Sequence, residues 1–342
     1  YPGLYDTFSF VIGNFLVKIF SGNVMEIKHL INLIFSFSAL IGLFLISKKL
    51  FNEEVAYLAV LMCLINPFFF GHMSMNPKDN IISFALIWFA YSVYMYCINF
   101  EKKRFGFLIL ASLFMGFGLG TRVSFFAITI PIILSAIIFL ILNNKKYQNY
   151  LDFKKISFDF FVFASISFFL MIVAWPHIHN DFYLLFETII KSIQWTSGPN
   201  LELMDGSIYE TTNTPKTYFA SFFLFRFPIF TLILLFALIF FLIKDIEFFI
   251  SNFRNFKIQI AIIFFIILFP MILAIIFQVK LYNGIRLFLF IIPFFSLLIS
   301  ICFYYILKNF KKSVFIKTIF SAVIIFFLLF LQRFIYLTPY HY

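Results

Sequence analysis

The chain has 342 residues, of which 63% are hydrophobic and 12% charged, and its formal net charge is +11. A water-soluble protein of this size could not cover its surface with so few polar side chains, so the composition excludes that class and predicts an all-α, polytopic membrane protein. Nucleic-acid binding would require the positive charge to form a patch on one face of a domain. The lysines and arginines concentrate instead in one set of connections between spans, which indicates how the chain is oriented in the membrane.

Apolar runs long enough to cross a bilayer, about 20 residues each, recur along the whole chain. They predict about ten transmembrane helices in a single domain over residues 1–342. In chain order the runs cover residues 31–46, 55–70, 81–99, 105–120, 123–142, 158–175, 218–243, 258–277, 287–307 and 315–331.

Two further segments, 7–19 and 181–194, are shorter and amphipathic. They favour either short helices in the membrane interface or packing under a loop. Residues 176–216 form the only long connection between predicted spans. Cys63, Cys97 and Cys302 fall in apolar runs without a CxxC spacing, which favours buried thiols over metal or redox chemistry.

Basic residues alternate in density between the two sets of connections. One set carries 16 of the 26 lysines and arginines, including every dibasic cluster, among them Lys48-Lys49, Lys102-Lys103-Arg104 and Lys311-Lys312. The positive-inside rule assigns this set to the cytoplasm. The unusual polar clusters therefore lie on the opposite, outer face, which is periplasmic in a bacterial inner membrane and lumenal if the source is a eukaryote.

A polar segment, Gly71-His72-Met73-Ser74-Met75-Asn76-Pro77-Lys78-Asp79-Asn80, separates two of the predicted spans. Pro77 suits the first turn of a helix, and Asp79 in that turn is favoured by the helix dipole. Asp79 is thus either a helix cap, with Lys78 reaching the lipid headgroups, or a carboxylate that binds a metal or an acceptor beside a phosphate-binding cation. His72 precedes it by seven residues and joins the candidate site.

Two arginines lie between spans on the same predicted face. Arg122 follows a glycine string, Gly116-x-Gly118-x-Gly120-Thr121, with no acidic residue within ten positions. No strand precedes the string, so it does not predict a dinucleotide fold, and small residues there allow close helix packing. Arg286 ends the segment Tyr282-Asn283-Gly284-Ile285. Each arginine either extends its side chain to the membrane surface or binds an anion. Together with Lys78, the two arginines predict a binding site for a phosphorylated lipid.

The long connection supplies the last candidates. Trp175-Pro176-His177-Ile178-His179 ends a span, and Trp195 follows further along. The HxH spacing is a weak metal signal by itself. His177 and Trp195 therefore belong either to a loop that covers a substrate or to a structural cap.

Taken together, these motifs resemble the GT-C glycosyltransferases of the protein O-mannosyltransferase and lipid A aminoarabinose transferase type. The resemblance covers nearly the whole chain, and the order of the motifs carries it more than any single one. The matching segments are Tyr1-Pro2-Gly3-Leu4-Tyr5, Asn76-Pro77-Lys78-Asp79, Gly118-x-Gly120-Thr121-Arg122, Trp175-Pro176-His177 and Gly284-Ile285-Arg286 with Pro293.

The resemblance implies a polyprenyl-phosphate sugar as donor, cations that hold its phosphate, and at times a divalent metal, Mg²⁺ or Mn²⁺. It implies that a first span and an acidic motif carrying the principal catalytic carboxylate precede Tyr1, so we expect the chain to be a fragment whose residues 1–28 are the remnant of the first outer loop. Asp6 is the only carboxylate in residues 1–20 and is the candidate base there. Asp79 matches the second acidic position, which aligns a metal or the acceptor.

The sequence thus predicts a membrane glycosyltransferase, inverting by resemblance, that transfers a sugar to a protein, lipid or polysaccharide acceptor on the outer face. Two alternatives stay open. The first is another enzyme of polyprenyl-linked glycans, such as an O-antigen polymerase or ligase. The second is a transporter or flippase, which would place charged residues in mid-span or show internal symmetry; a purely structural membrane subunit ranks with it. Nucleic acid is not an expected partner.

Overall fold

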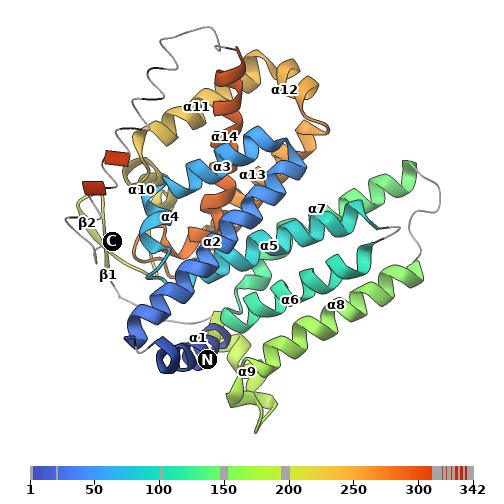
Figure 1. Ribbon diagram of the computed structural model, residues 1–342, viewed down its shortest axis with the longest axis vertical. Helices are drawn as coiled ribbons and strands as arrows, with labels where there is room; N and C mark the ends of the chain where they lie inside the picture. The colour runs from blue at the N-terminus through green and yellow to red at the C-terminus, as the bar shows by residue number, and fades with distance from the viewer. Residues whose placement is uncertain are drawn as a thin grey trace.

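The computed structural model describes residues 3–20, 22–100, 103–146, 153–193 and 201–309, and isolated helical residues between 318 and 336 (Figure 1). Its elements, in chain order, are α1 (Leu4–Phe20), α2 (Val24–Leu50), α3 (Glu53–Leu64), α4 (Pro67–His72), α5 (Asp79–Ile98), α6 (Arg104–Thr121), α7 (Phe125–Lys146), α8 (Phe153–Val173), η1 (Pro176–Ile178), α9 (Tyr183–Ile193), β1 (Leu201–Met204), β2 (Ser207–Glu210), α10 (Tyr218–Arg226), α11 (Ile229–Lys244), α12 (Ile246–Asn252), α13 (Phe256–Ile276), η2 (Arg286–Ile291) and α14 (Ile292–Asn309).

Seven helices in the described part of the chain are long and apolar enough to cross a membrane. They are α2, α5, α6, α7, α8, α13 and the stretch from η2 through α14, and each coincides with a predicted span. The structure thereby confirms an all-α, polytopic helical bundle. The predicted span 315–331 lies largely outside the described residues.

Two predicted spans are not continuous helices, which corrects the sequence analysis. In 55–70, the helix ends at Leu64, and Asn66 caps a new helix by accepting hydrogen bonds from the Phe68 and Phe69 N–H groups, with Pro67 in its first turn. In 218–243, Pro228 follows Phe227, whose backbone is extended, and α10 meets α11 at 114°. If this bent pair is one span, the described residues hold eight.

Residues 176–216, predicted as a long loop, contain regular structure. The described part holds η1, α9 and an antiparallel hairpin of β1 with β2, in which Leu203 pairs with Ile208. Asp205 and Gly206 both have positive φ at the hairpin turn, the conformation that a two-residue hairpin loop requires. The predicted interfacial segments 7–19 and 181–194 correspond to α1 and α9.

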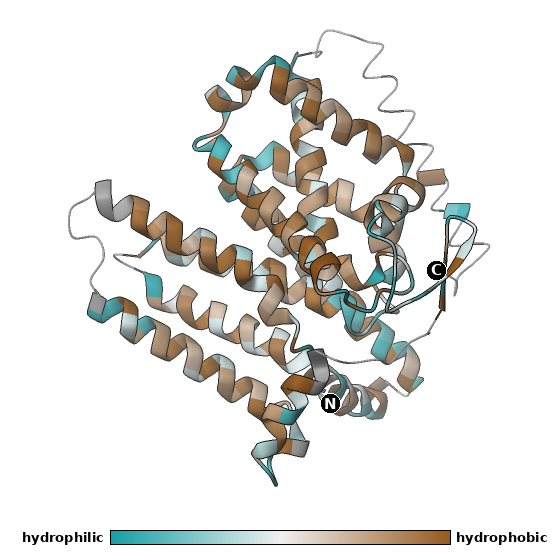
Figure 2. Cartoon of the chain, turned by 180° about the vertical axis from the view of Figure 1, so that it is seen from behind, coloured by the Kyte–Doolittle hydropathy of each residue, from teal (hydrophilic) through white to brown (hydrophobic). Residues whose placement is uncertain are grey.

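The bundle is built around α5 and α14. Helix α5 packs against α2, α6, α7 and η2, while α14 packs against α3, α11 and α13. Figure 1 shows α5 to α8 side by side, with α3 and α10 to α14 on the other side of α2. Residues along α14 are almost all buried, whereas α8 exposes large apolar side chains such as Phe160 and Phe169. Figure 2 shows hydrophobic residues along the helices and hydrophilic ones toward their ends.

The helix ends rich in basic residues meet at one end of the bundle. Lys48 at the end of α2 pairs with Glu53, Lys308 at the end of α14 pairs with Glu54, and Tyr94 near the end of α5 donates to the Lys49 carbonyl. The connections that carry the predicted site residues leave the same helices at the opposite end. The two sets of connections are thus separated by the length of the spans, as the positive-inside reading requires.

A buried ion pair fastens α6 to α8 at the basic end. Arg104 Nε donates to Asp159 Oδ2 at 2.6 Å, and the Tyr96 hydroxyl donates to the same oxygen at 2.9 Å. The Asp159 side chain is 2% exposed. A carboxylate so buried is tolerable only with its partners in place.

We expect Asp159→Ala to destabilise the protein by about 3–5 kcal/mol, because it removes the carboxylate that Arg104 and Tyr96 hold in a buried position. Thermal unfolding in detergent measures this effect. Glu54→Ala, which breaks the solvent-exposed pair with Lys308, is the matched control and should change the melting temperature little. Equal shifts in the two variants would contradict the structural role given to Asp159.

Candidate functional site

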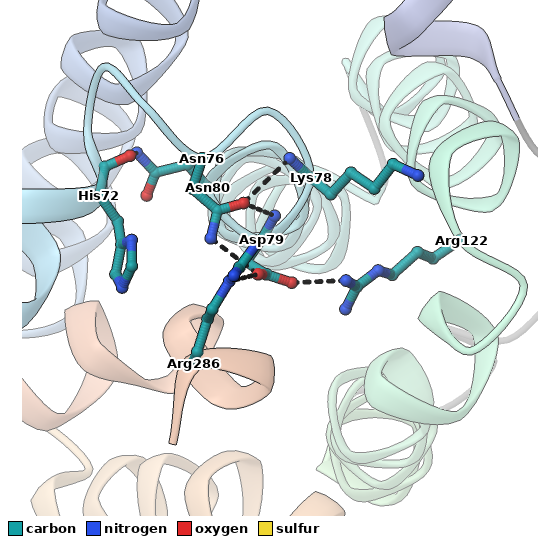
Figure 3. A network of polar contacts seen from close by, with 7 residues as sticks. All are labelled: His72, Asn76, Lys78, Asp79, Asn80, Arg122 and Arg286. Atoms are coloured by element: carbon teal, nitrogen blue, oxygen red, sulfur yellow. Dashed lines mark hydrogen bonds and ion pairs between the residues drawn. The ribbon is translucent and has the colours of Figure 1, made fainter. Parts of the chain in front are cut away.

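The candidate site forms where α5 begins. Asn76 starts the turn before the helix, because its side-chain Oδ1 accepts hydrogen bonds from the N–H groups of Lys78, at 3.2 Å, and Asp79, at 2.9 Å. Lys78 occupies the N-cap position and makes no side-chain cap hydrogen bond, so the side chain that supports the start of the helix is that of Asn76 and not that of Asp79. The Asp79 carboxylate does not cap the helix and points instead toward other segments of the chain (Figure 3).

The Asp79 carboxylate binds two arginines from distant parts of the chain. Arg286 Nε donates to Oδ2 at 3.1 Å, and Arg122 Nη2 lies 2.7 Å from Oδ1 in an ion pair. Asn76 Nδ2 also donates to Oδ2, at 2.7 Å. The Asp79 side chain is 1% exposed, so the contacts lie in a medium where charge–charge interaction is stronger than in water. The structure thus brings Asp79, Arg122 and Arg286 together.

The two arginines keep hydrogen-bonding capacity beyond their contact with Asp79. Their side chains are 27% exposed in Arg122 and 41% exposed in Arg286. A guanidinium carries five N–H donors, so each can bind a further anion while it holds Asp79. Figure 3 shows Lys78 extending on the Arg122 side of the cluster. Two guanidinium groups share one carboxylate, which leaves an excess of positive charge that suits a phosphate.

Arg122 has an acidic partner, which corrects the sequence analysis. The nearest acidic residues in sequence are more than ten positions from Arg122, so no local pattern predicts its pairing with Asp79 on a neighbouring helix. The glycines before it act as predicted, by close packing. A Cβ on Gly118 would lie 2.3 Å from the Phe125 ring, and one on Gly120 would lie 2.9 Å from Ala174. These contacts fold the chain back tightly on both sides of Arg122.

A chain of amide and hydroxyl groups supports the loop that carries Asp79. Asn80 Nδ2 donates to Ser36 Oγ at 2.6 Å and to the His72 carbonyl at 2.8 Å. Ser36 Oγ donates to the Met73 carbonyl, and Asn32 Nδ2 donates to the Ser74 carbonyl at 2.7 Å. All of these side chains on α2 and α5 are buried. They tie the connection 72–80 to α2, and the sequence analysis did not identify them.

His72 lies half-buried at the edge of this cluster, with its ring against Phe68 and beside Arg286 (Figure 3). Burial, and next the charge of Arg286, lower the pKa of His72 below its ordinary value, while Asp79 opposes the shift. His72 is therefore neutral at physiological pH and adds a hydrogen-bonding group to the site without adding charge.

Two of the remaining predicted residues, Asp6 and His177, fall on α1 and η1. Asp6 is an exposed residue of α1, and a Cβ on Gly120 would lie 3.0 Å from Leu4, so the start of α1 packs near the end of α6 that leads to Arg122. Among the described contacts, none joins the Asp6 carboxylate to Asp79. His177 falls in η1, and Trp195 lies outside the described residues. A ring nitrogen of His179 lies 2.9 Å from the Ile172 carbonyl.

The described residues offer no ready ligand set for a divalent metal. No group of three His, Cys, Asp or Glu side chains comes together among them, and both oxygens of Asp79 contact arginine. A magnesium or manganese ion binds through several oxygen ligands, which one carboxylate engaged in this way does not supply. A role for Asp79 toward Mg²⁺ or Mn²⁺ stays a prediction.

Comparison with known proteins gives one match. The model of the family described as "Dolichyl-phosphate-mannose-protein mannosyltransferase" matches residues 8–178, which is half of the chain. The matched region includes His72, Lys78, Asp79 and Arg122, and Arg286 follows it in sequence. No curated protein and no solved structure matches the chain.

We expect His72 to make stability depend on pH. Its lowered pKa means that the unfolded chain binds a proton that the folded protein resists, so stability falls as pH drops below about 6.5. Melting temperatures in detergent, taken from about pH 7.5 to 5.5, should fall less in His72→Gln than in the wild type. His29→Gln, on α2, is the matched control. The same pH slope in His72→Gln and in the wild type would contradict this assignment.

Proposed function

The chain belongs to the dolichyl-phosphate-mannose-protein mannosyltransferase family, and on that premise we propose that it transfers a sugar from a polyprenyl phosphate to an acceptor on the outer face of the membrane. The family makes it a membrane glycosyltransferase of the mannosyltransferase type. The observation that carries the proposal is the buried contact of Asp79 with Arg122 and Arg286.

The reaction needs a site of this kind. The acceptor hydroxyl oxygen forms a bond to the anomeric carbon, the bond from that carbon to the phosphate oxygen breaks, and its electron pair stays on the phosphate. Negative charge therefore grows on the leaving group. Fixed guanidinium groups in a site of low dielectric stabilise that charge, and an arginine can bind two phosphate oxygens at once. We assign this role to Arg122 and Arg286, because both keep exposed N–H donors while they hold Asp79.

Asp79 organises the two arginines. Both guanidinium groups lie within 3.1 Å of the Asp79 carboxylate, so without its negative charge the two like charges would repel each other. With it, each guanidinium has one fixed partner and keeps donors for the phosphate. Because both oxygens of Asp79 already contact cations, we assign it an organising role and not that of the base.

The acceptor proton has to leave to a base, and within this chain Asp6 stays the candidate. It is exposed on α1, whose first residues pack near the end of α6 that leads to Arg122. Asp6 would act from the end of the bundle that holds the two arginines.

The face and the partners follow from the charge distribution. The site lies at the opposite end from the dibasic clusters, which supports the outer, periplasmic face of a bacterial inner membrane. The family description names a protein acceptor and a mannose donor for the family. For this chain we keep the acceptor as protein, lipid or polysaccharide. The family favours a transferase over a transporter or a structural subunit.

We expect Arg286→Ala to lose the polyprenyl phosphate that co-purifies with the protein, because it removes one of the two arginines of the phosphate site. Asp79→Asn should keep the lipid, since the net positive charge rises, but should lower turnover about 10- to 100-fold because the arginines lose their fixed position. Lipid mass spectrometry and a transfer assay measure the two effects.

Arg254→Ala is the matched control, since Arg254 is an exposed arginine at the basic end of the bundle. It should retain both lipid and turnover. Only bulk phospholipid in the wild type and all variants would count against the proposed donor.

A further inference from the structure

The turn that carries Arg286 has an unusual backbone. Asn283 and Gly284 both have positive φ, 56° and 64°. A Cβ on Gly284 would lie 3.0 Å from the Phe222 ring, so glycine also fits the space. Neighbouring N–H groups in such a turn can face the same side and form a concave site for an anion.

A carboxylate from the hairpin occupies that concave site. The Asn283 N–H donates to Glu202 Oε2 at 3.0 Å, and the Gly284 N–H donates to Glu202 Oε1 at 3.0 Å. Glu202 is a β1 residue, more than 80 positions earlier in the chain, and neither the motifs nor the family match includes it. Hydrogen bonds to an ionised acceptor are stronger than neutral ones.

The hairpin is itself fastened to the bundle. Met204 is buried, and the Ser221 hydroxyl on α10 donates to Asp205 Oδ2 at 2.8 Å. The turn gains two more supports, because the Tyr218 hydroxyl donates to the Gly284 carbonyl at 2.9 Å and the Leu281 N–H donates to the Thr211 carbonyl at 3.0 Å. The turn is thus held by contacts from the hairpin, from the segment after it and from α10.

We propose that Glu202 is the positioning residue for Arg286, and that hairpin 201–210 thereby sets the affinity of the site for the donor phosphate. Arg286 follows Gly284 by two residues and reaches Asp79 with a side chain that is 41% exposed. A side chain so open has little packing to fix it, so its place depends on where the turn holds its backbone. This inference rests on the proposed function, since it concerns the same phosphate site.

Glu202→Gln tests the role sharply. The amide keeps one acceptor and turns an N–H₂ group toward a backbone donor, so one of the two contacts is lost. The expected result is roughly 5- to 10-fold weaker binding of undecaprenyl phosphate, measured by native mass spectrometry in detergent, with KM for the donor rising in step. Glu210→Gln removes the same charge from an exposed position of the same hairpin and should bind as the wild type does.

Two further variants separate positioning from general loss of structure. Tyr218→Phe removes the other side-chain support of the turn and should weaken binding in the same direction. In an Arg286→Ala background, whose residual affinity is measured by titration with excess undecaprenyl phosphate, Glu202→Gln should cause no further loss, because Glu202 acts through that arginine. A full additional loss in the double variant would overturn the inference.

The outcomes distinguish the two proposals. Wild-type affinity in Glu202→Gln, together with weakened binding in Arg286→Ala, would overturn the positioning role and leave the proposed function standing. Wild-type affinity in Arg286→Ala would instead remove the phosphate site itself, and the proposed function would fail with it.

Discussion

The buried carboxylate of Asp79 is the constraint on which the site depends. An ionised group that is 1% exposed in an apolar bundle is tolerable only with cations and hydrogen-bond donors around it. The partners of the carboxylate come from three places: Asn76 on the same turn and Arg286 at the start of η2 donate hydrogen bonds, and Arg122 after α6 forms an ion pair. Burying this charge therefore requires α5, the end of α6 and the last described span to meet at one point.

The two buried carboxylates of the described chain differ in what surrounds them. Asp159 meets one arginine and a tyrosine hydroxyl, so its charge is balanced and its contact fastens α6 to α8. Asp79 meets two arginines, with Lys78 beside it, so positive charge is left over. The first arrangement explains stability alone. The second arrangement leaves an uncompensated positive charge that an anion could neutralise. We therefore propose that the chemistry takes place at the end of the bundle that holds Asp79.

Hydropathy predicted the membrane class and seven helices because each is a long apolar run, and the distribution of basic residues predicted that Asp79, Arg122 and Arg286 lie on one face. Neither pattern predicted which groups would pair, since partners 207 residues apart leave no local pattern. Other features had readable signals. Pro67 and Pro228 mark the broken spans, and Asp205-Gly206 between alternating apolar residues is a hairpin signal within a segment interpreted as a loop.

Charge by itself would not let this site select its donor, because every phospholipid around the protein also carries a phosphate. Selection requires the donors to hold one geometry before the lipid arrives, so that binding does not have to order them. Asp79 fixes one side of Arg286, and the turn held by Glu202 fixes the other. The polar contacts from α2 to the connection 72–80 fix Asp79 in turn. On this view the buried asparagines and the remote hairpin contribute to recognition by holding in place the arginines that we propose bind the phosphate.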